Sequence, residues 1–348
     1  MNIFLGLIII ALGCFATSSF YVPINRVKQW SWESFWLVQG VFAWLVVPFL
    51  GAYLFMPPGT LMGVLTSNGS AAGWAMFYGA LWGIGGLTFG LGIRYLGVAL
   101  GMSLGYGTCA AFGTLLPPIL KGENLLTSVD GLILIAGVSV AIAAIAVIGY
   151  AGHLKSKGLS EEERRKAVKD FALKKGLIIA LVAGFMSACF SLGLEAGEPI
   201  RQAALSRGTH GLFAQNPVTL LVTFGGFFTN LVYCLVQGVR NKTITDYVSV
   251  PPKVLLNNVM FCALAGALWY MQFFGQGMGK HFLAASPVML AFSWSILMSF
   301  NILFSNLWGI WLKEWSGVTK RTIMVLVAGL LVLVLSTLLP EILNRVMG

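Results

Sequence analysis

The chain has 348 residues, of which 57% are apolar and only 10% are charged, and its formal net charge is +10. A water-soluble domain carries about 25% charged residues, so this composition excludes a soluble globular protein. The sequence has no basic stripe with interleaved aromatic residues and no nucleic-acid-binding motif, so the positive charge does not indicate a nucleic-acid partner. Lipid must surround most of the chain.

A helix that spans a membrane needs about 20 mostly apolar residues, and ten stretches of this sequence meet that requirement. We therefore expect an all-α integral membrane protein. The first stretch has no basic start and no small-residue cleavage site behind it, so we expect a spanning helix there and not a removed signal peptide. The ten expected spans are 2–22, 34–55, 73–93, 97–119, 131–151, 176–196, 216–238, 254–276, 286–311 and 322–341.

Lys and Arg residues are distributed unevenly over the connections between these spans. The first, third, fifth, seventh and ninth connections hold 17 of the 22 basic residues, and the other connections and the C-terminal tail hold five. Basic residues are retained on the cytoplasmic side of a membrane. We therefore expect a multi-pass protein of the bacterial cytoplasmic (inner) membrane with both termini on the periplasmic side.

The charged connection over residues 152–175 divides the chain into two halves of five spans, residues 1–151 and 176–348. Ser160 and Glu163 have the spacing of a capping box, which predicts a short surface helix from Ser160 to about Lys174 in this cytoplasmic linker. Because five is odd, the two halves enter the membrane from opposite sides.

Two sequence matches between the halves indicate an ancient duplication. Residues 6–20 align without gaps on residues 176–190, and the Gly-Ala-Leu-Trp stretch at 79–82 recurs at 266–269. Each match joins a span to the span five later, as an inverted repeat requires. Inverted repeats are typical of secondary transporters.

The expected spans lack the side chains of an enzyme site. The sequence shows no Ser-His-Asp set, no paired catalytic carboxylates, no phosphate-binding loop and no cluster of metal ligands. All five cysteines lie in apolar runs, without a CxxC pair. We therefore expect a protein that is not an enzyme and that needs no metal and no cofactor.

Two acids are candidates for proton coupling, because a charge in hydrocarbon costs at least about 2.5–3.5 kcal/mol and so needs a function. Glu195 lies at the outer end of the sixth span, one helical turn from Glu198. Two acids so close together can raise each other's pKa, which suits a proton carrier. Glu33 begins the second span among tryptophans. The structural alternatives are a solvated helix end for Glu195 and an interfacial aromatic belt around Glu33.

Uncharged polar and aromatic side chains inside the spans suit a neutral sugar, which offers hydroxyl groups at its edge and C–H groups on its face. Trp82 and Trp269 occupy matching positions of the two repeats, so an inverted repeat would set both against the central axis. For any single amide or hydroxyl, a hydrogen bond between helices is the structural alternative. The candidate sugar-binding residues are Trp82, Trp269, Tyr270, Gln272, Asn258, Asn230, Tyr21, Gln39 and Tyr106.

Six stretches of the chain resemble the bacterial L-rhamnose–proton symporter family, in the same order from about residue 20 to about residue 315. The Trp-Ser-Trp-Glu and Trp-Tyr-x-Gln-Phe-Phe patterns are the most specific of them. The resemblance implies the fold of the drug/metabolite transporter superfamily, with ten helices in two inverted five-helix repeats, and proton-driven uptake of a deoxyhexose. The six stretches are Lys28–Glu33, Trp82–Gly85, Arg94–Gly97, Leu173–Leu177, Trp269–Phe274 and Leu312–Trp315.

These observations predict a monomeric secondary active transporter that takes up L-rhamnose or a related deoxysugar together with protons by alternating access. One alternative is an exporter or exchanger of another metabolite within the same superfamily. The other is a membrane-embedded enzyme that acts on a lipid-linked sugar, with catalytic groups from Glu195 and Glu198 or from Glu33 and Arg26.

Overall fold

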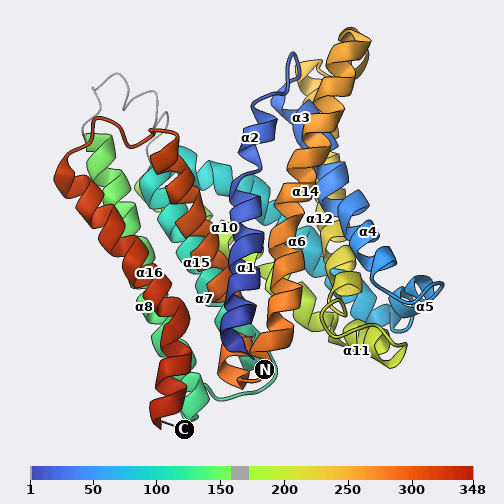
Figure 1. The fold of residues 1–348 in the computed structure, drawn as a ribbon. Helices are drawn as coiled ribbons and strands as arrows, with labels where there is room; N and C mark the ends of the chain where they lie inside the picture. The colour runs from blue at the N-terminus through green and yellow to red at the C-terminus, as the bar shows by residue number, and fades with distance from the viewer. Residues whose placement is uncertain (1, 158–171, 348) are drawn as a thin grey trace. The chain divides into compact units, whose positions relative to one another are not determined.

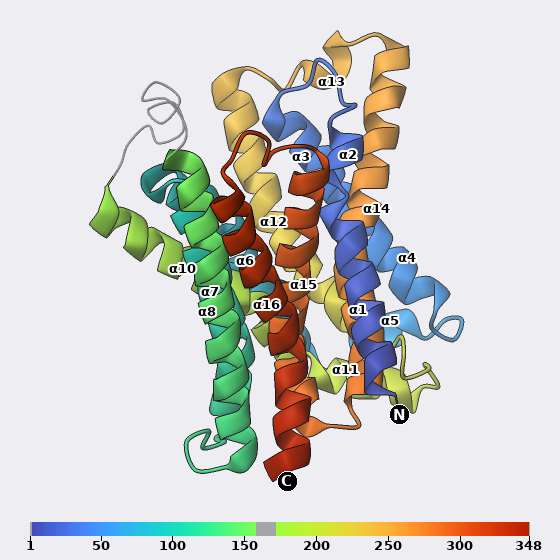
Figure 2. The same cartoon turned by 60° about the vertical axis from the view of Figure 1, so that its left-hand side comes forward.

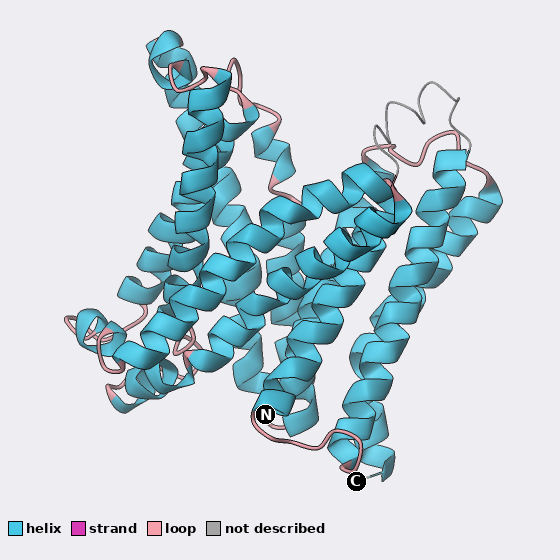
Figure 3. Cartoon of the chain, turned by 180° about the vertical axis from the view of Figure 1, so that it is seen from behind, coloured by secondary structure: helices cyan, strands magenta, loops and turns pink. Residues whose placement is uncertain are grey.

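The computed structural model describes residues 2–157 and 172–347, and its regular elements in these ranges are all helices (Figure 1). Figure 3 shows only helices and loops in the same ranges, without a strand. The elements are α1 (Ile3–Ser18), α2 (Tyr21–Ile24), α3 (Trp32–Val41), the π-helical turn η1 (Phe42–Val46), α4 (Val47–Leu54), α5 (Leu61–Leu65), α6 (Gly69–Leu96), α7 (Val98–Leu120), α8 (Val129–Lys157), α10 (Leu173–Ala196), α11 (Glu198–Ser206), α12 (Asn216–Asn241), α13 (Asp246–Ser249), α14 (Pro252–Leu283), α15 (Pro287–Trp311) and α16 (Lys320–Met347).

Nine stretches of the described residues are helical, long and apolar enough to cross a membrane. They coincide with nine of the ten expected spans, so the prediction of an all-helical protein with many membrane-spanning helices is confirmed. α7 fills the place of the fourth expected span, 97–119, but is not among the nine. The total of ten crossings and the repeat therefore stay predictions.

Several helices continue beyond their expected ends. α8 extends to Lys157 instead of 151, and α16 extends to Met347 instead of 341. Basic residues such as Lys157 and Arg345 stand in the last turns, where they stabilise the negative end of the helix dipole in water. Hydropathy marks only the part of a helix that lies in lipid. The predicted surface helix from Ser160 lies outside the described residues except for its last positions, where α10 begins at Leu173.

The helices form two compact units. Unit 1 comprises Met1–Leu7, Ile84–Leu192 and Phe282–Gly348, and unit 2 comprises Ile8–Gly83 and Gly193–His281. Each unit takes helices from both halves of the sequence, so the compact units and the predicted repeats divide the chain differently.

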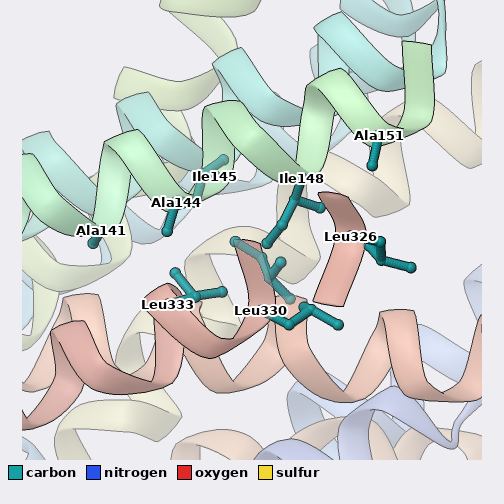
Figure 4. Close-up of a cluster of buried hydrophobic side chains, with 9 residues drawn as sticks. Ala141, Ala144, Ile145, Ile148, Ala151, Leu326, Leu330 and Leu333 are labelled. Atoms are coloured by element: carbon teal, nitrogen blue, oxygen red, sulfur yellow. The ribbon is translucent and has the colours of Figure 1, made fainter. Parts of the chain in front are cut away.

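In unit 1, α8 and α16 lie side by side along their length, as Figures 1 and 2 both show. Alanines on α8 face leucines on α16, so that small and large side chains interdigitate (Figure 4). Apolar side chains gain no hydrophobic free energy when they leave lipid for a helix interface. Close packing of this kind therefore holds membrane helices together. The labelled residues are Ala141, Ala144, Ile145, Ile148, Ala151, Leu326, Leu330 and Leu333.

In unit 2, glycines bring α14 close to two other helices. A Cβ atom on Gly13 of α1 would lie 2.5 Å from the carbonyl oxygen of Met271, and a Cβ atom on Gly266 would lie 2.8 Å from the carbonyl oxygen of Gln39. Only glycine permits such an approach between backbones. These two contacts fix the middle of α14, residues 266–271, against α1 and α3.

The interface of α8 and α16 yields a stability prediction. Leu333 is fully buried in it, and Leu331, two residues away on the same helix, is 60% exposed. We expect Leu333→Ala to lower the free energy of unfolding by about 2–5 kcal/mol because it leaves a cavity. In detergent, its melting temperature should fall by several degrees, whereas Leu331→Ala should melt within about one degree of the wild type. Equal melting of the two variants would contradict this packing.

Candidate functional site

Unit 2 contains a cluster of five aromatic side chains, Trp36, Trp44, Trp82, Trp269 and Phe273, which we call the aromatic cluster. The rings of Trp82 and Trp269 lie 5.8 Å apart, centre to centre, at an interplanar angle of 39°. Trp44 stands edge-on to both, at 6.0 and 5.6 Å. The two tryptophans that the predicted repeat would relate are therefore neighbours in space, and both are half-buried.

The backbone at Trp269 is held by two side-chain donors. The hydroxyl of Thr17 donates to the Trp269 carbonyl oxygen at 2.7 Å, and the amide of Gln272 donates to the same oxygen at 3.1 Å. On the other side of the pair, Gly226 lies under the ring of Trp82, where a larger residue would collide with it. These contacts orient the indoles, and they give Gln272 a positioning role beside the aromatic cluster.

Two candidate polar residues are completely buried without a hydrogen-bond partner at their side-chain atoms. Among the described residues, both amide atoms of Gln39 and the hydroxyl of Tyr270 have no partner. The Tyr270 hydroxyl lies beside Gly51 of α4, where a Cβ atom would be 3.6 Å from it. A buried polar group without a partner costs about 1–3 kcal/mol.

Two candidate asparagines are already committed to protein partners. The Asn258 amide pairs with the backbone of Lys28, accepting from its N–H at 3.0 Å and donating to its carbonyl oxygen at 2.7 Å. The Asn230 oxygen accepts from the Trp36 indole at 3.2 Å, and its nitrogen donates to the Gly226 carbonyl oxygen at 2.9 Å. Both amides thus join segments of unit 2.

The last two sugar-binding candidates are not members of the aromatic cluster. Tyr21 is 60% exposed, with its ring against that of Phe20. Tyr106 belongs to unit 1, where its ring packs against that of Phe89 at 5.1 Å.

Glu33 takes part in a polar network at one end of unit 2. Its Oε1 atom accepts hydrogen bonds from the Asn241 amide at 2.9 Å and from the Thr243 hydroxyl at 2.6 Å. In the reverse direction, Asp246 Oδ2 accepts from the Ser31 N–H and from the hydroxyls of Ser31 and Ser34, all within 2.8 Å. Glu33 at the start of α3 therefore binds the end of α12 and the segment after it, and Asp246 of that segment binds the start of α3. We call these contacts the acid clasp.

Glu198 is paired with a base and not with its acidic neighbour. The Arg201 guanidinium makes two hydrogen bonds to its carboxylate, at 2.6 and 2.7 Å, and the Gln202 amide makes a third at 2.7 Å. Arg201 is also within electrostatic range of Glu195. The sequence did not reveal Arg201 as the partner of Glu198.

Comparison with known proteins shows the family of this chain. Residues 1–342 match the model of the family described as L-rhamnose-proton symport protein (RhaT). The chain belongs to this family. Two curated relatives named L-rhamnose-proton symporter, from Yersinia pestis (strain Pestoides F) and Yersinia pseudotuberculosis serotype O:1b (strain IP 31758), are each 36% identical over 340 residues, which cover 96% of both chains. The family consists of transporters, so this chain is a transporter and not an enzyme, and the lipid-linked sugar enzyme is set aside.

Trp44 and Trp36 are members of the aromatic cluster that the sequence reasoning missed. A signal was present, because Trp44 stands in the middle of the second expected span, 34–55, whereas tryptophans of an interfacial belt stand near the ends. Among the described residues no group of three or more His, Cys, Asp and Glu side chains is placed to hold a metal ion.

The acid clasp yields a prediction on pH. Burial of the Asp246 carboxylate opposes its charged form, but the hydrogen bonds from Ser31 and Ser34 outweigh burial and hold the pKa of Asp246 below its usual value. A lowered pKa contributes stability above the unfolded pKa of about 3.9, and this stability is lost as the pH falls through the folded pKa. We expect Asp246→Asn to melt a few degrees below the wild type between pH 5 and 8 and the difference to shrink below about pH 4.

Thermal unfolding in detergent across this pH range measures the effect. Ser249→Ala is the control, because its hydroxyl is exposed and contacts only the Asp246 carbonyl oxygen. A difference between Asp246→Asn and the wild type that stays constant down to pH 3 would contradict the role of the charged carboxylate.

Proposed function

We propose that this chain takes up L-rhamnose, or a closely related deoxysugar, together with protons by alternating access. The observation that carries the proposal is the pair Trp82 and Trp269, which face each other at 5.8 Å from repeat-related positions. Aromatic faces pack well against apolar C–H groups. The names of the curated relatives, L-rhamnose-proton symporter, supply the substrate and the coupling ion.

The sugar site that we propose combines these faces with buried hydrogen-bonding groups. The sugar's C–H face and methyl group stack on Trp82 or Trp269, and its hydroxyl groups bind Gln39 and Tyr270, whose polar atoms have no protein partner. Asn230, Asn258 and Gln272 act mainly through the backbone segments that they hold. No charged residue is needed, which suits a neutral sugar.

We propose ten membrane crossings in two inverted repeats of the drug/metabolite transporter superfamily. Helices that such repeats make equivalent contact each other inside the units: the second span (α3, η1 and α4) with α12, α7 with α15, and α8 with α16. Elements beside a two-fold axis contact their own symmetry mates. These contacts support the repeat over residues 1–151 and 176–348, with 152–175 as its cytoplasmic linker.

The positions of the two chain ends support the even number of crossings. Ile3 and Phe4 of α1 line one cavity of about 150 Å³ together with Leu338, Glu341 and Arg345 of α16, all within unit 1. Ends on the same side of a membrane require an even number of crossings, which supports α7 as the tenth. The bias of basic residues then puts both ends on the periplasmic side of the inner membrane. We propose that the protein functions there as a monomer, surrounded by lipid.

Glu33 and Glu195 are the residues that we propose for proton coupling. Glu33 is buried, and its carboxylate accepts two hydrogen bonds across the acid clasp. A proton on Glu33 would remove acceptor capacity from the clasp and so favour a state in which the clasp is open. A bound proton can shift such an equilibrium only through this difference between the two states.

Uptake of radiolabelled L-rhamnose into proteoliposomes tests the proposed function. We expect an outside-acid pH gradient to accelerate uptake, and addition of rhamnose to alkalinise a weakly buffered outside medium. Trp269→Ala should lower uptake about tenfold, because it removes a stacking surface worth about 1.5 kcal/mol. Trp74→Ala is the matched control, since Trp74 is an exposed indole of α6 outside the aromatic cluster. An equal rate of rhamnose uptake with and without the pH gradient would exclude proton symport.

A further inference from the structure

The second membrane span is interrupted by a π-helical turn. α3 ends at Val41, η1 covers Phe42–Val46, and the N–H of Val47 donates to the carbonyl oxygen of Phe42, five residues back. A single π-helical turn inside an α-helix is rare and frequently marks a functional site. Trp44 is the middle residue of this turn.

The ring of Trp44 is held on several sides. It stands edge-on to Trp36, Trp82 and Trp269, with ring centres 5.6–6.0 Å away. It also lies directly over Gly40, where a Cβ atom would come within 2.5 Å of ring atom Cζ3. The direction of the indole N–H is therefore set by the protein.

This indole N–H differs from that of its neighbour in the aromatic cluster. The Trp36 N–H donates to the Asn230 oxygen at 3.2 Å. The Trp44 N–H is buried, in a residue only 2% exposed, and no atom of the described residues accepts it. Gln39, one turn earlier in the same span, is fully buried with both amide atoms unpartnered. One stretch of helix thus carries two donors and an acceptor without protein partners.

Such groups are costly unless a ligand binds them. A buried donor without an acceptor destabilises the protein, and a sugar hydroxyl oxygen placed at the N–H removes that cost. An indole N–H only donates, so it requires an oxygen at one position, whereas the Gln39 amide both donates and accepts. A site with such a fixed donor rejects an analogue that lacks the oxygen, because the donor stays unpaired.

We propose that the Trp44 indole N–H donates a hydrogen bond to one particular hydroxyl oxygen of the transported sugar and thereby makes that hydroxyl a requirement for transport. This inference rests on the proposed function. It assigns Trp44 a role in substrate specificity, and Gly40 the role of holding its ring in place.

Competition with labelled L-rhamnose uptake by the 2-, 3- and 4-deoxy analogues of L-rhamnose tests the inference. For the wild type, we expect half-inhibition by one analogue to require a concentration about tenfold higher than half-inhibition by unlabelled L-rhamnose. We call this ratio of concentrations the penalty of the analogue. In Trp44→Phe, which keeps an aromatic ring but lacks the N–H, that penalty should fall to within about twofold, and the penalties of the other two analogues should remain. Trp74→Phe, at an exposed indole, should behave like the wild type.

A second variant separates the loss of the N–H from a folding defect caused by the smaller ring of Trp44→Phe. Benzothienylalanine at position 44 keeps the size of the ring and replaces the N–H by sulfur, and we expect the same loss of one penalty. The inference is overturned if the variants keep the penalty of the wild type, or if no analogue shows a penalty in the wild type. Absence of rhamnose uptake by the wild type would instead overturn the proposed function, and this inference with it.

Discussion

Lipid removes water from the middle of every span, so each buried polar atom there must find its partner inside the protein or bind a ligand. The polar residues of unit 2 meet this constraint in different ways. The Asn230 and Asn258 amides each pair with groups of the protein. Gln39 and Trp44 have buried polar atoms that pair with no atom of the described residues. We base the proposed sugar site on these atoms, because a neutral polar substrate could supply the missing partners.

Close backbone contacts make that arrangement possible. Gly13 and Gly266 let α14 approach α1 and α3, and Gly40 leaves room for the ring of Trp44. Trp269 stands on α14, three residues after Gly266, and its carbonyl oxygen receives the Thr17 hydroxyl from α1. Small residues at helix contacts thus fix the large rings of the aromatic cluster. A transporter that changes state must move these helices as packed groups, because packed interfaces have few stable arrangements.

The helical kind of the elements and nine of the ten expected spans followed from sequence, because a spanning helix has a fixed minimum of apolar length. Helix ends did not, since α8 and α16 continue into water where hydropathy gives no signal. The neighbourhood of Trp82 and Trp269 could be predicted from the repeat match alone, and their ring contact confirms that they meet.

Hydrogen-bond partners were beyond prediction, because they are set by the backbone groups and side chains that packing brings alongside. Asn258 pairs with the Lys28 backbone, and Glu198 pairs with Arg201 and not with Glu195. The place of the Trp44 ring could not be predicted, because a π-helical turn leaves no pattern in the sequence and this turn decides where the ring stands.

Direct binding of L-rhamnose to the purified protein tests, without transport, whether the sugar stacks on the pair Trp82 and Trp269. In a calorimetric titration, the wild type and Trp74→Ala should bind rhamnose with the same affinity. Trp82→Ala and Trp269→Ala should each bind at least about tenfold more weakly. Unchanged rhamnose affinity in both of these variants would contradict the account.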